Sequence, residues 1–169
     1  QDPKKYPGRC ILGSENSVRY DAWQAVADNP YVSGQFLWIG IDYLGEAAGW
    51  PVRSWTGGLF DLCGFKKPEG WFRQSLWSDR PMVYLCARLQ RQDRRRGPQS
   101  HWNWPARSAV AVFAYSNCPE VTLELNGQTL ESRQPTQGSW PMARWEVSFE
   151  PGTLTAIGKK DGREVCRYA

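Results

Sequence analysis

The sequence predicts an α+β chain in two parts, and a change of pattern near residue 80 indicates the division. Over residues 1–80, short apolar runs alternate with segments of helical spacing, as in α/β folding units. Over residues 81–169, apolar and polar residues alternate with a period of two, which is typical of antiparallel strands. With 169 residues, 41% hydrophobic and 22% charged, the chain is long enough for one good core or two small units.

The first part begins with a predicted strand and helix. The apolar run "CILG" ends at Gly13 and is followed closely by a carboxylate, Glu15. The segment "RYDAWQAVADNP" has apolar residues near helical spacing, and it stops at Asn29-Pro30, a common helix terminator. A strand followed by a helix is therefore expected over these residues.

A second strand and a second helix follow. The run from Phe36 to Ile41 is nearly continuously apolar, which predicts a strand buried on both faces, as in a parallel sheet. After a loop rich in Gly and Trp, "PEGWFRQSLWSDRP" has a helix start at Pro68 and a stop near Pro81. Two such strand–helix units cannot close a sheet by themselves.

The second part predicts a β-sandwich. Asn126-Gly127 between two alternating runs predicts a tight hairpin turn, because both positions tolerate positive φ. A second turn is expected at Lys160-Asp161-Gly162. Counting "MVYLCARL" as the entry strand gives about seven short strands, which favours a sandwich of immunoglobulin type.

Three carboxylates follow the two predicted strands of the first part: Glu15 follows the first, and Asp42 and Glu46 follow the second. Barrel enzymes place catalytic groups at the C-terminal ends of parallel strands. A retaining glycosidase needs one ionised carboxylate to attack the anomeric carbon and one protonated carboxyl for the leaving oxygen. Acidic residues are common at strand ends, so this pattern alone does not assign a reaction.

Longer motifs carry a resemblance to a family. "CILGSENSVRYDAW", "NPYVSGQFLWIGIDYLGEAAGWP" and "GLFDLCGFKKPEGWFRQSLWSDRPMVYL" resemble the last quarter of the catalytic barrel of glycoside hydrolase family 2, and most closely its bacterial β-galactosidases. The family's seventh strand ends in a Gly-[Ser/Thr]-Glu element whose glutamate is the nucleophile. Gly13-Ser14-Glu15 matches that element, so the resemblance implies that Glu15 is the nucleophile.

The resemblance also implies the substrate-binding residues. The family's eighth strand reads Gly-x-Phe-x-Trp and is followed by an Asp-Tyr-x-Gly-Glu element. The matching residues are Gly34, Phe36, Trp38, Asp42, Tyr43, Gly45 and Glu46. By this likeness Trp38 lines the sugar subsite, Asp42 lies close to it, and Glu46 contributes to binding.

The remainder of the chain is similar to a β-sandwich domain of unknown function that follows the barrel in many such enzymes. The implied architecture is therefore a partial (β/α)8 barrel segment over residues 1–80 and an immunoglobulin-like β-sandwich over residues 81–169. The implied activity is retaining hydrolysis of terminal β-linked galactose, although β-glucuronidases and β-mannosidases also belong to the family.

One departure from the family limits the expected activity. The family's acid/base is a Glu preceded by Asn at the end of the fourth strand, and this sequence contains no Asn-Glu pair. The first six barrel strands are absent, so we expect a C-terminal piece of a larger hydrolase. Asp42 or Glu46 would need a raised pKa in a dry pocket to replace the acid, and a quarter barrel excludes water poorly. We therefore expect no turnover from the chain alone.

Two other readings remain open from the sequence. The chain can act as a non-catalytic module that binds carbohydrate or braces a barrel, and an exposed coplanar Trp pair on the sandwich would favour binding. Trp102 and Trp104 beside His101 form either such a platform or an anchor for the connector, and we favour the anchor. Alternatively, the first part completes a compact domain with the sandwich.

The composition gives no reason to expect a nucleic-acid or membrane partner. The Arg-rich stretch over residues 88–107 predicts a solvated connector, and no RRM or KH signature accompanies it, so no nucleic-acid partner is expected. The sequence contains no run of 18 apolar residues, so no membrane span is expected. No signal-peptide pattern opens the sequence, and the resemblance is compatible with a periplasmic or secreted enzyme.

The cysteines predict neither a zinc site nor a disulfide framework, because the five are odd in number and none has CxxC spacing. Most are expected to be buried small apolar residues. His101 lacks partner ligands at useful spacing, so no metal site is predicted. No organic cofactor is implied either, and carbohydrate is the expected ligand of the parent enzyme.

Overall fold

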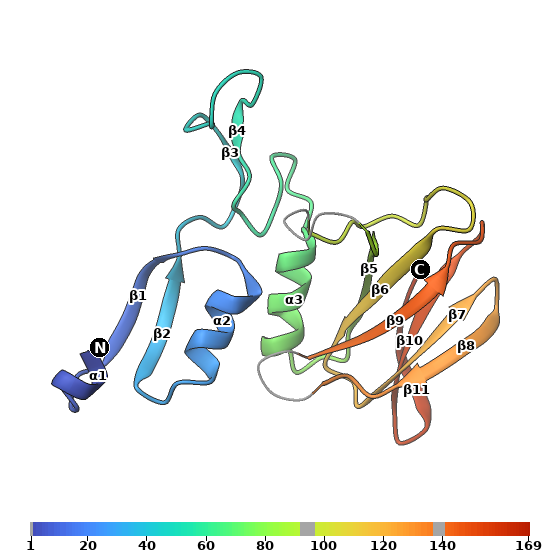
Figure 1. The fold of residues 1–169 in the computed structure, drawn as a ribbon. Helices are drawn as coiled ribbons and strands as arrows, with labels where there is room; N and C mark the ends of the chain where they lie inside the picture. The colour runs from blue at the N-terminus through green and yellow to red at the C-terminus, as the bar shows by residue number, and fades with distance from the viewer. Residues whose placement is uncertain (1, 92–96, 137–140) are drawn as a thin grey trace. The chain divides into compact units, whose positions relative to one another are not determined.

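The computed structural model describes residues 2–91, 97–136 and 141–169, which are mostly β-strand. The chain divides into two compact units, the first ending at Gly70 and the second beginning at Trp71 (Figure 1). This division falls inside a helix, ten residues before the boundary drawn from the change of sequence pattern.

The helices are α1 (Asp2–Lys5), α2 (Tyr20–Ala27) and α3 (Pro68–Trp77). The strands before α3 are β1 (Ile11–Asn16), β2 (Val32–Leu37), β3 (Tyr43–Leu44) and β4 (Ser54–Trp55). The strands after α3 are β5 (Val83–Leu89), β6 (Ala109–Ser116), β7 (Glu120–Leu125), β8 (Gln128–Arg133), β9 (Met142–Ser148), β10 (Leu154–Lys160) and β11 (Arg163–Tyr168).

The first unit is built on one strand–helix–strand repeat. β1 and β2 pair in parallel, with Asn16 opposite Leu37 near their C-terminal ends, and α2 connects them and lies against β2 (Figure 1). The predicted order of strand, helix and strand is confirmed. A parallel pair places the C-terminal ends of both strands at the same edge of the sheet.

The expectation that the second strand is buried on both faces is wrong for this chain. Neither β1 nor β2 contains a buried residue, and Phe36 of β2 is 63% exposed. Ile41, at the end of the same apolar run, is 58% exposed. A two-stranded sheet with one helix beside it offers too little surface to cover both of its faces, so the apolar run remains open.

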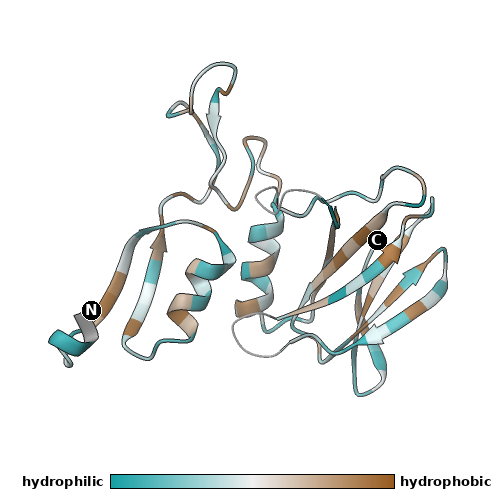
Figure 2. Cartoon of the chain, viewed as in Figure 1, coloured by the Kyte–Doolittle hydropathy of each residue, from teal (hydrophilic) through white to brown (hydrophobic). Residues whose placement is uncertain are grey.

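The second unit contains two antiparallel sheets with a common core. One sheet has the order β5-β6-β9, and the other has the order β11-β10-β7-β8. Figure 2 shows hydrophobic residues along β6, whereas hydrophobic and hydrophilic residues alternate along β9. The buried core residues are Val83, Leu85, Ala87, Val110, Val112, Ala114, Val121, Leu123, Leu125, Ala143, Trp145, Phe149, Leu154 and Ala156. Alternate residues of both sheets therefore meet in one apolar cluster.

The later turns of α3 cover the outer face of the β5-β6-β9 sheet. Trp71 stacks on Tyr84 of β5 with ring centroids 5.0 Å apart, and Phe72 meets Tyr115 of β6 edge-on at 5.6 Å. Because these rings lie on the face opposite the core, β6 is buried on both sides over most of its length. The helix therefore packs onto the second unit from Trp71 onward.

Both predicted hairpin turns are confirmed. Asn126 and Gly127 have φ of +53° and +79° between β7 and β8. Asp161 and Gly162 have φ of +52° and +72° between β10 and β11. Two consecutive positive φ values match the twist of the flanking strands.

In the part of the chain that the structure describes, the helices are all too short or too polar to cross a lipid bilayer.

Candidate functional site

The C-terminal ends of β1 and β2 bring Glu15 and Trp38 to one edge of the parallel sheet. Glu15 is the penultimate residue of β1 and is exposed, and Trp38 directly follows β2 with half of its surface exposed. The amide of Trp38 donates a hydrogen bond to the carbonyl oxygen of Asn16 at 2.9 Å. This bond continues the backbone ladder past β2, so Glu15 and Trp38 lie at the ends of adjacent strands.

Local packing at the end of β1 depends on a glycine. The side chain of Asn16 folds back over Gly13, where an added Cβ would collide with its amide group. From that position the Asn16 amide donates to the carbonyl oxygen of Phe36 on β2 at 3.5 Å. Among the described residues Glu15 forms no salt bridge, so its carboxylate is not held in a surface ion pair.

Tyr43 is hydrogen-bonded to Glu46 at this edge. The Tyr43 hydroxyl donates to a carboxylate oxygen of Glu46. This bond is the largest influence on the pKa of Tyr43 and raises it, because losing the proton would place two anions in contact. The nearby Trp38 side chain acts on the pKa in the opposite direction. Glu46, one of the predicted substrate-binding residues, is thus held by Tyr43.

Asp42 has a different environment from its neighbour Tyr43. Its side chain is buried, and its carboxylate accepts hydrogen bonds from the Gly58 amide at 2.8 Å and from Lys67 Nζ at 3.0 and 3.1 Å. Lys67 also donates to the carbonyl oxygen of Thr56 at 2.8 Å. Asp42 therefore fastens the loop over residues 56–67 to the segment after β2, and the sugar contact expected of it stays a prediction.

A glycine makes this close approach possible. An added Cβ at Gly58 would lie 2.6 Å from the Asp42 nitrogen and 2.7 Å from the Ile41 carbonyl carbon. Both are backbone atoms, so the conflict could not be relieved by moving a side chain. Neither Gly58 nor Lys67 was singled out from the sequence, because only the fold brings them to Asp42.

Further aromatic side chains are exposed in the β3–β4 hairpin that follows. Trp50 is 79% exposed and Trp55 is 43% exposed. The Arg53 guanidinium lies over the Trp50 ring, 4.6 Å from its centroid. An exposed indole face is a common platform for the C–H groups of a sugar ring, although it also serves protein contacts.

The second unit holds Trp102 and Trp104 as packing residues. Trp102 donates from Nε1 to the carbonyl oxygen of Glu150 at 3.0 Å, and its ring lies 5.2 Å from that of Phe149. Trp104 packs against the core cluster, and the His101 ring lies 4.5 Å from it. These contacts favour the anchor over the sugar platform.

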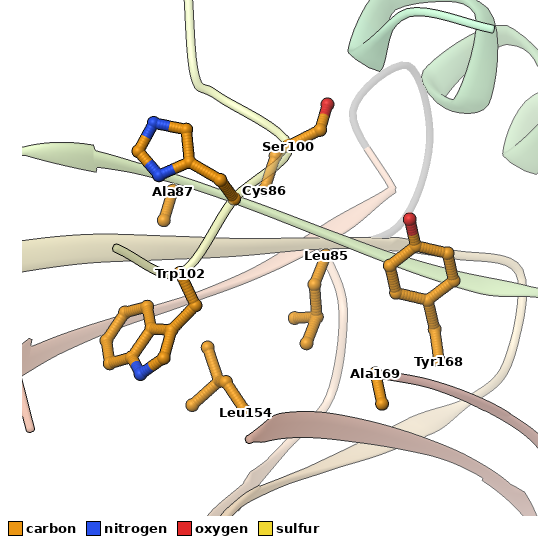
Figure 3. A pocket seen from close by; sticks show the side chains of 9 residues that line it. Leu85, Cys86, Ala87, Ser100, Trp102, Leu154, Tyr168 and Ala169 are labelled. Carbon is orange, nitrogen blue, oxygen red and sulfur yellow. The ribbon is translucent and has the colours of Figure 1, made fainter. Parts of the chain in front are cut away.

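A small pocket of about 80 Å³ lies beside these residues (Figure 3). Trp102 and Tyr168 stand on opposite sides of it, and most of the wall between them is apolar. Of its polar groups, the Ser100 hydroxyl already bonds the Tyr84 hydroxyl at 2.6 Å. Sugar sites need several convergent polar groups, so this pocket gives little support for carbohydrate recognition.

The described residues contain no group of three or more His, Cys, Asp or Glu side chains placed to hold a metal ion. Three arginines of the predicted connector, Arg94, Arg95 and Arg96, lie outside the described residues.

Comparisons with known proteins identify relatives of both units. Residues 108–166 match a family described as a domain of unknown function, DUF4982. The chain is 34% identical over 148 residues to the β-galactosidase BoGH2A of Bacteroides ovatus, covering 86% of this chain and 16% of that protein. It is 35% identical over 153 residues to a Formosa agariphila protein that carries a β-glucuronidase name, covering 86% of this chain and 14% of that protein.

Solved structures agree in fold. A glycosyl hydrolase family 2 member from Bacteroides cellulosilyticus matches 99% of this chain with a TM-score of 0.78 and 30% identity. A β-glycosidase from Bacteroides vulgatus matches 88% with a TM-score of 0.72 and 32% identity. This chain spans 25% and 17% of those two chains, so it corresponds to only a segment of each relative.

Proposed function

Because this chain is a segment of a glycoside hydrolase family 2 polypeptide, we propose that its two parts have the architecture of that family. Residues 1–80 would be the last strands and helices of a (β/α)8 barrel, and residues 81–169 an immunoglobulin-like sandwich. The parallel β1–α2–β2 repeat supports the first assignment. The sheet orders β5-β6-β9 and β11-β10-β7-β8 support the second, since seven strands are divided between two packed antiparallel sheets.

The proposed reaction is retaining hydrolysis of a terminal β-glycoside, with Glu15 as the nucleophile. Its carboxylate would attack the anomeric carbon, and the aglycone oxygen would take a proton from an acid supplied outside this chain. Water would then release the sugar from the glycosyl-enzyme. The observation that carries the proposal is the backbone bond between Trp38 and Asn16, because it sets the residue after β2 beside the end of β1, where Glu15 has no salt bridge among the described residues.

The other predicted residues have distinct proposed roles. The exposed face of Trp38 would stack on the sugar, while Tyr43 holds Glu46. Glu46 would accept hydrogen bonds from sugar hydroxyls. Asp42 would lie behind this surface, where its bonds to Lys67 keep the following loop in place.

We propose a terminal β-galactoside as the substrate. One named relative is a β-galactosidase, and the Asp-Tyr-x-Gly-Glu element resembles that group. A uronic acid would require a cation for its carboxylate. Within residues 34–67 the basic side chains already have partners: Arg53 lies over Trp50, Lys66 over Phe60, and Lys67 on Asp42. A β-glucuronide remains the alternative, since a relative carries that name.

The test uses chromogenic β-galactosides and β-glucuronides with two proteins: this chain alone and a polypeptide in which it completes a whole barrel. The complete barrel should hydrolyse the galactoside faster, and Glu15→Gln should lower kcat by about 10⁴-fold or more. Asp28→Asn, an exposed carboxylate at the end of α2, is the matched control and should leave the rate unchanged.

This chain alone should show no turnover, because it lacks an acid and a closed pocket. Retention of more than a tenth of the activity in Glu15→Gln would exclude Glu15 as the nucleophile. Faster glucuronide hydrolysis would overturn the substrate but not the reaction.

The non-catalytic binding module has less support. On the described strands and loops of the sandwich itself, Trp102 and Trp104 are partly buried and Trp145 is fully buried, so these three indoles offer no coplanar exposed pair. Titrating β-linked oligosaccharides into the chain while following Trp emission distinguishes the two functions. A saturable change that survives Trp38→Ala would favour a binding site elsewhere in the chain.

A further inference from the structure

Two cysteine side chains meet in the second unit. Cys118 follows β6, and Cys166 lies on the last strand, β11. Their Sγ atoms are 3.5 Å apart, although both residues are free thiols in this structure. Cys118 is buried and Cys166 is partly exposed, so a reagent can reach the pair from the side of Cys166.

The space that the two sulfurs share is left by a glycine. Gly158 on β10 is directly opposite Cys166 in the β10–β11 ladder. A Cβ added at Gly158 would lie 2.5 Å from the Cys166 sulfur and 2.8 Å from the Cys118 sulfur. Both thiols therefore occupy the volume in which a side chain at position 158 would stand, and they face each other across it.

We propose that Cys118 and Cys166 form an intrachain disulfide when the protein meets a disulfide oxidant. A disulfide needs the sulfurs at about 2.05 Å, so they must approach by roughly 1.5 Å. The space above Gly158 leaves both sulfurs room to turn toward each other, so we expect side-chain rotation to supply most of this movement. The bond would tie β11 to the segment between β6 and β7.

The exchange balances with a small disulfide as the oxidant. The Cys166 thiolate attacks one sulfur of the oxidant and expels one thiolate, which leaves a mixed disulfide. The Cys118 thiolate then attacks the Cys166 sulfur and expels the second thiolate. Two protons leave the cysteines, and two electrons reduce the oxidant to two thiols.

The environment of Cys166 sets the rate of the first step. Burial raises the pKa of its thiol to about 12, and the hydrogen bond with Cys118 adds to the shift. Few thiolates are then present at neutral pH, so formation of the disulfide should be slow there and should accelerate as the pH rises.

The disulfide should also stabilise the protein. Because it closes a loop between cysteines 48 residues apart in the sequence, it should raise the Tm by about 10 °C.

The experiment uses the full chain with Cys10→Ser and Cys63→Ser, which removes the exposed thiols of the first unit. After treatment with oxidised glutathione at pH 9, titratable thiols of the unfolded protein should fall from three to one. Peptide mapping by mass spectrometry should find Cys118 joined to Cys166, with Cys86 still reduced. A rise in Tm that reductant reverses should accompany the bond.

Single variants test the order of steps. With Cys118→Ser, the glutathione adduct on Cys166 should persist, because no thiol resolves it. With Cys166→Ser, Cys118 should remain largely unmodified, because it is buried. Circular dichroism checks that both variants fold. Three thiols that persist after prolonged oxidation of the background protein, or a stable glutathione adduct in place of the bond, would overturn the proposal.

Discussion

At the scale of single residues, neighbours after β2 serve different purposes. Tyr43 holds Glu46 at the exposed edge, whereas Asp42 forms a partly buried ion pair with Lys67. Removing one partner of a buried ion pair leaves an uncompensated charge, which costs more than the intact pair contributes. Lys67 therefore stabilises the loop conformation, because it compensates the charge of Asp42.

Lys67→Met should destabilise the loop over residues 56–67 by about 3 kcal/mol, because the Asp42 carboxylate would lose its cationic partner. Hydrogen exchange measures this locally: the Gly58 amide, which donates to Asp42, should lose protection. Lys66→Met is the matched control, since Lys66 lies over the Phe60 ring at 5.8 Å rather than on Asp42. Equal exchange rates in both variants would contradict the assigned role of Lys67.

The sequence predicts some residues of the site better than others. Glu15 stands out because a carboxylate closely follows an apolar run and because Gly13-Ser14-Glu15 matches a short family element, and both signals are local in the sequence. Its role as the nucleophile stays a prediction. The bond between Asp42 and Lys67 joins residues 25 apart across an irregular loop, and no periodicity indicates it. The exposure of Phe36 was also missed, because an apolar run does not reveal whether other strands cover it.

At the scale of elements, one side chain fixes the connection between α3 and β5. Asn117, after β6, donates to the carbonyl oxygens of Ser78 at 2.7 Å and Arg80 at 2.9 Å. Its carbonyl oxygen accepts from the Met82 amide at 2.9 Å. These bonds satisfy backbone groups between the helix and the strand, so they hold α3 in place on the outer face of the sheet.

Asn117→Ala should lower the free energy of unfolding of the second unit by about 2–3 kcal/mol, because three hydrogen bonds to the connection are lost. Urea denaturation followed by Trp emission measures the change. Asn103→Ala is the control, since the structure records a hydrogen bond only for the Asn103 backbone. A loss for Asn117→Ala no larger than that of the control would refute this account of the connection.

Local chemistry explains which elements were predictable. The turns at Asn126-Gly127 and Asp161-Gly162 follow from residues that tolerate positive φ. Val121, Leu123 and Leu125 are buried at alternate positions of β7 as their spacing predicts. The placement of α3 does not follow from its sequence. Its attachment to the second unit depends on Trp71 stacking on Tyr84, a contact that helical periodicity cannot distinguish from packing on another layer.

At the scale of the whole molecule, burial is divided unequally between the units. Every buried hydrophobic residue that the structure describes lies from Phe72 onward. In the first unit, large apolar side chains such as Phe36, Ile41 and Leu44 are more than half exposed. Burial of apolar surface is the main favourable term in folding, so the two units should differ in their capacity to fold alone.

We expect a fragment of residues 68–169 to unfold in one cooperative thermal transition, because it contains the whole core between the two sheets. A fragment of residues 1–67 should lack such a transition and should bind hydrophobic dyes, as expected of strands that pack against further barrel strands. Circular dichroism melts of both fragments check this. Cooperative unfolding of the 1–67 fragment would indicate a self-sufficient domain instead of a barrel segment.

The most direct test of the central claim is to trap the covalent intermediate. A polypeptide that completes the barrel around this chain is incubated with an activated fluorosugar β-galactoside, which slows release of the sugar, and the labelled peptide is sequenced by mass spectrometry. The account predicts one fluorogalactosyl group, esterified to Glu15 and absent from the Glu15→Gln protein. A label on Glu46 or another carboxylate, with Glu15 unmodified, would contradict it.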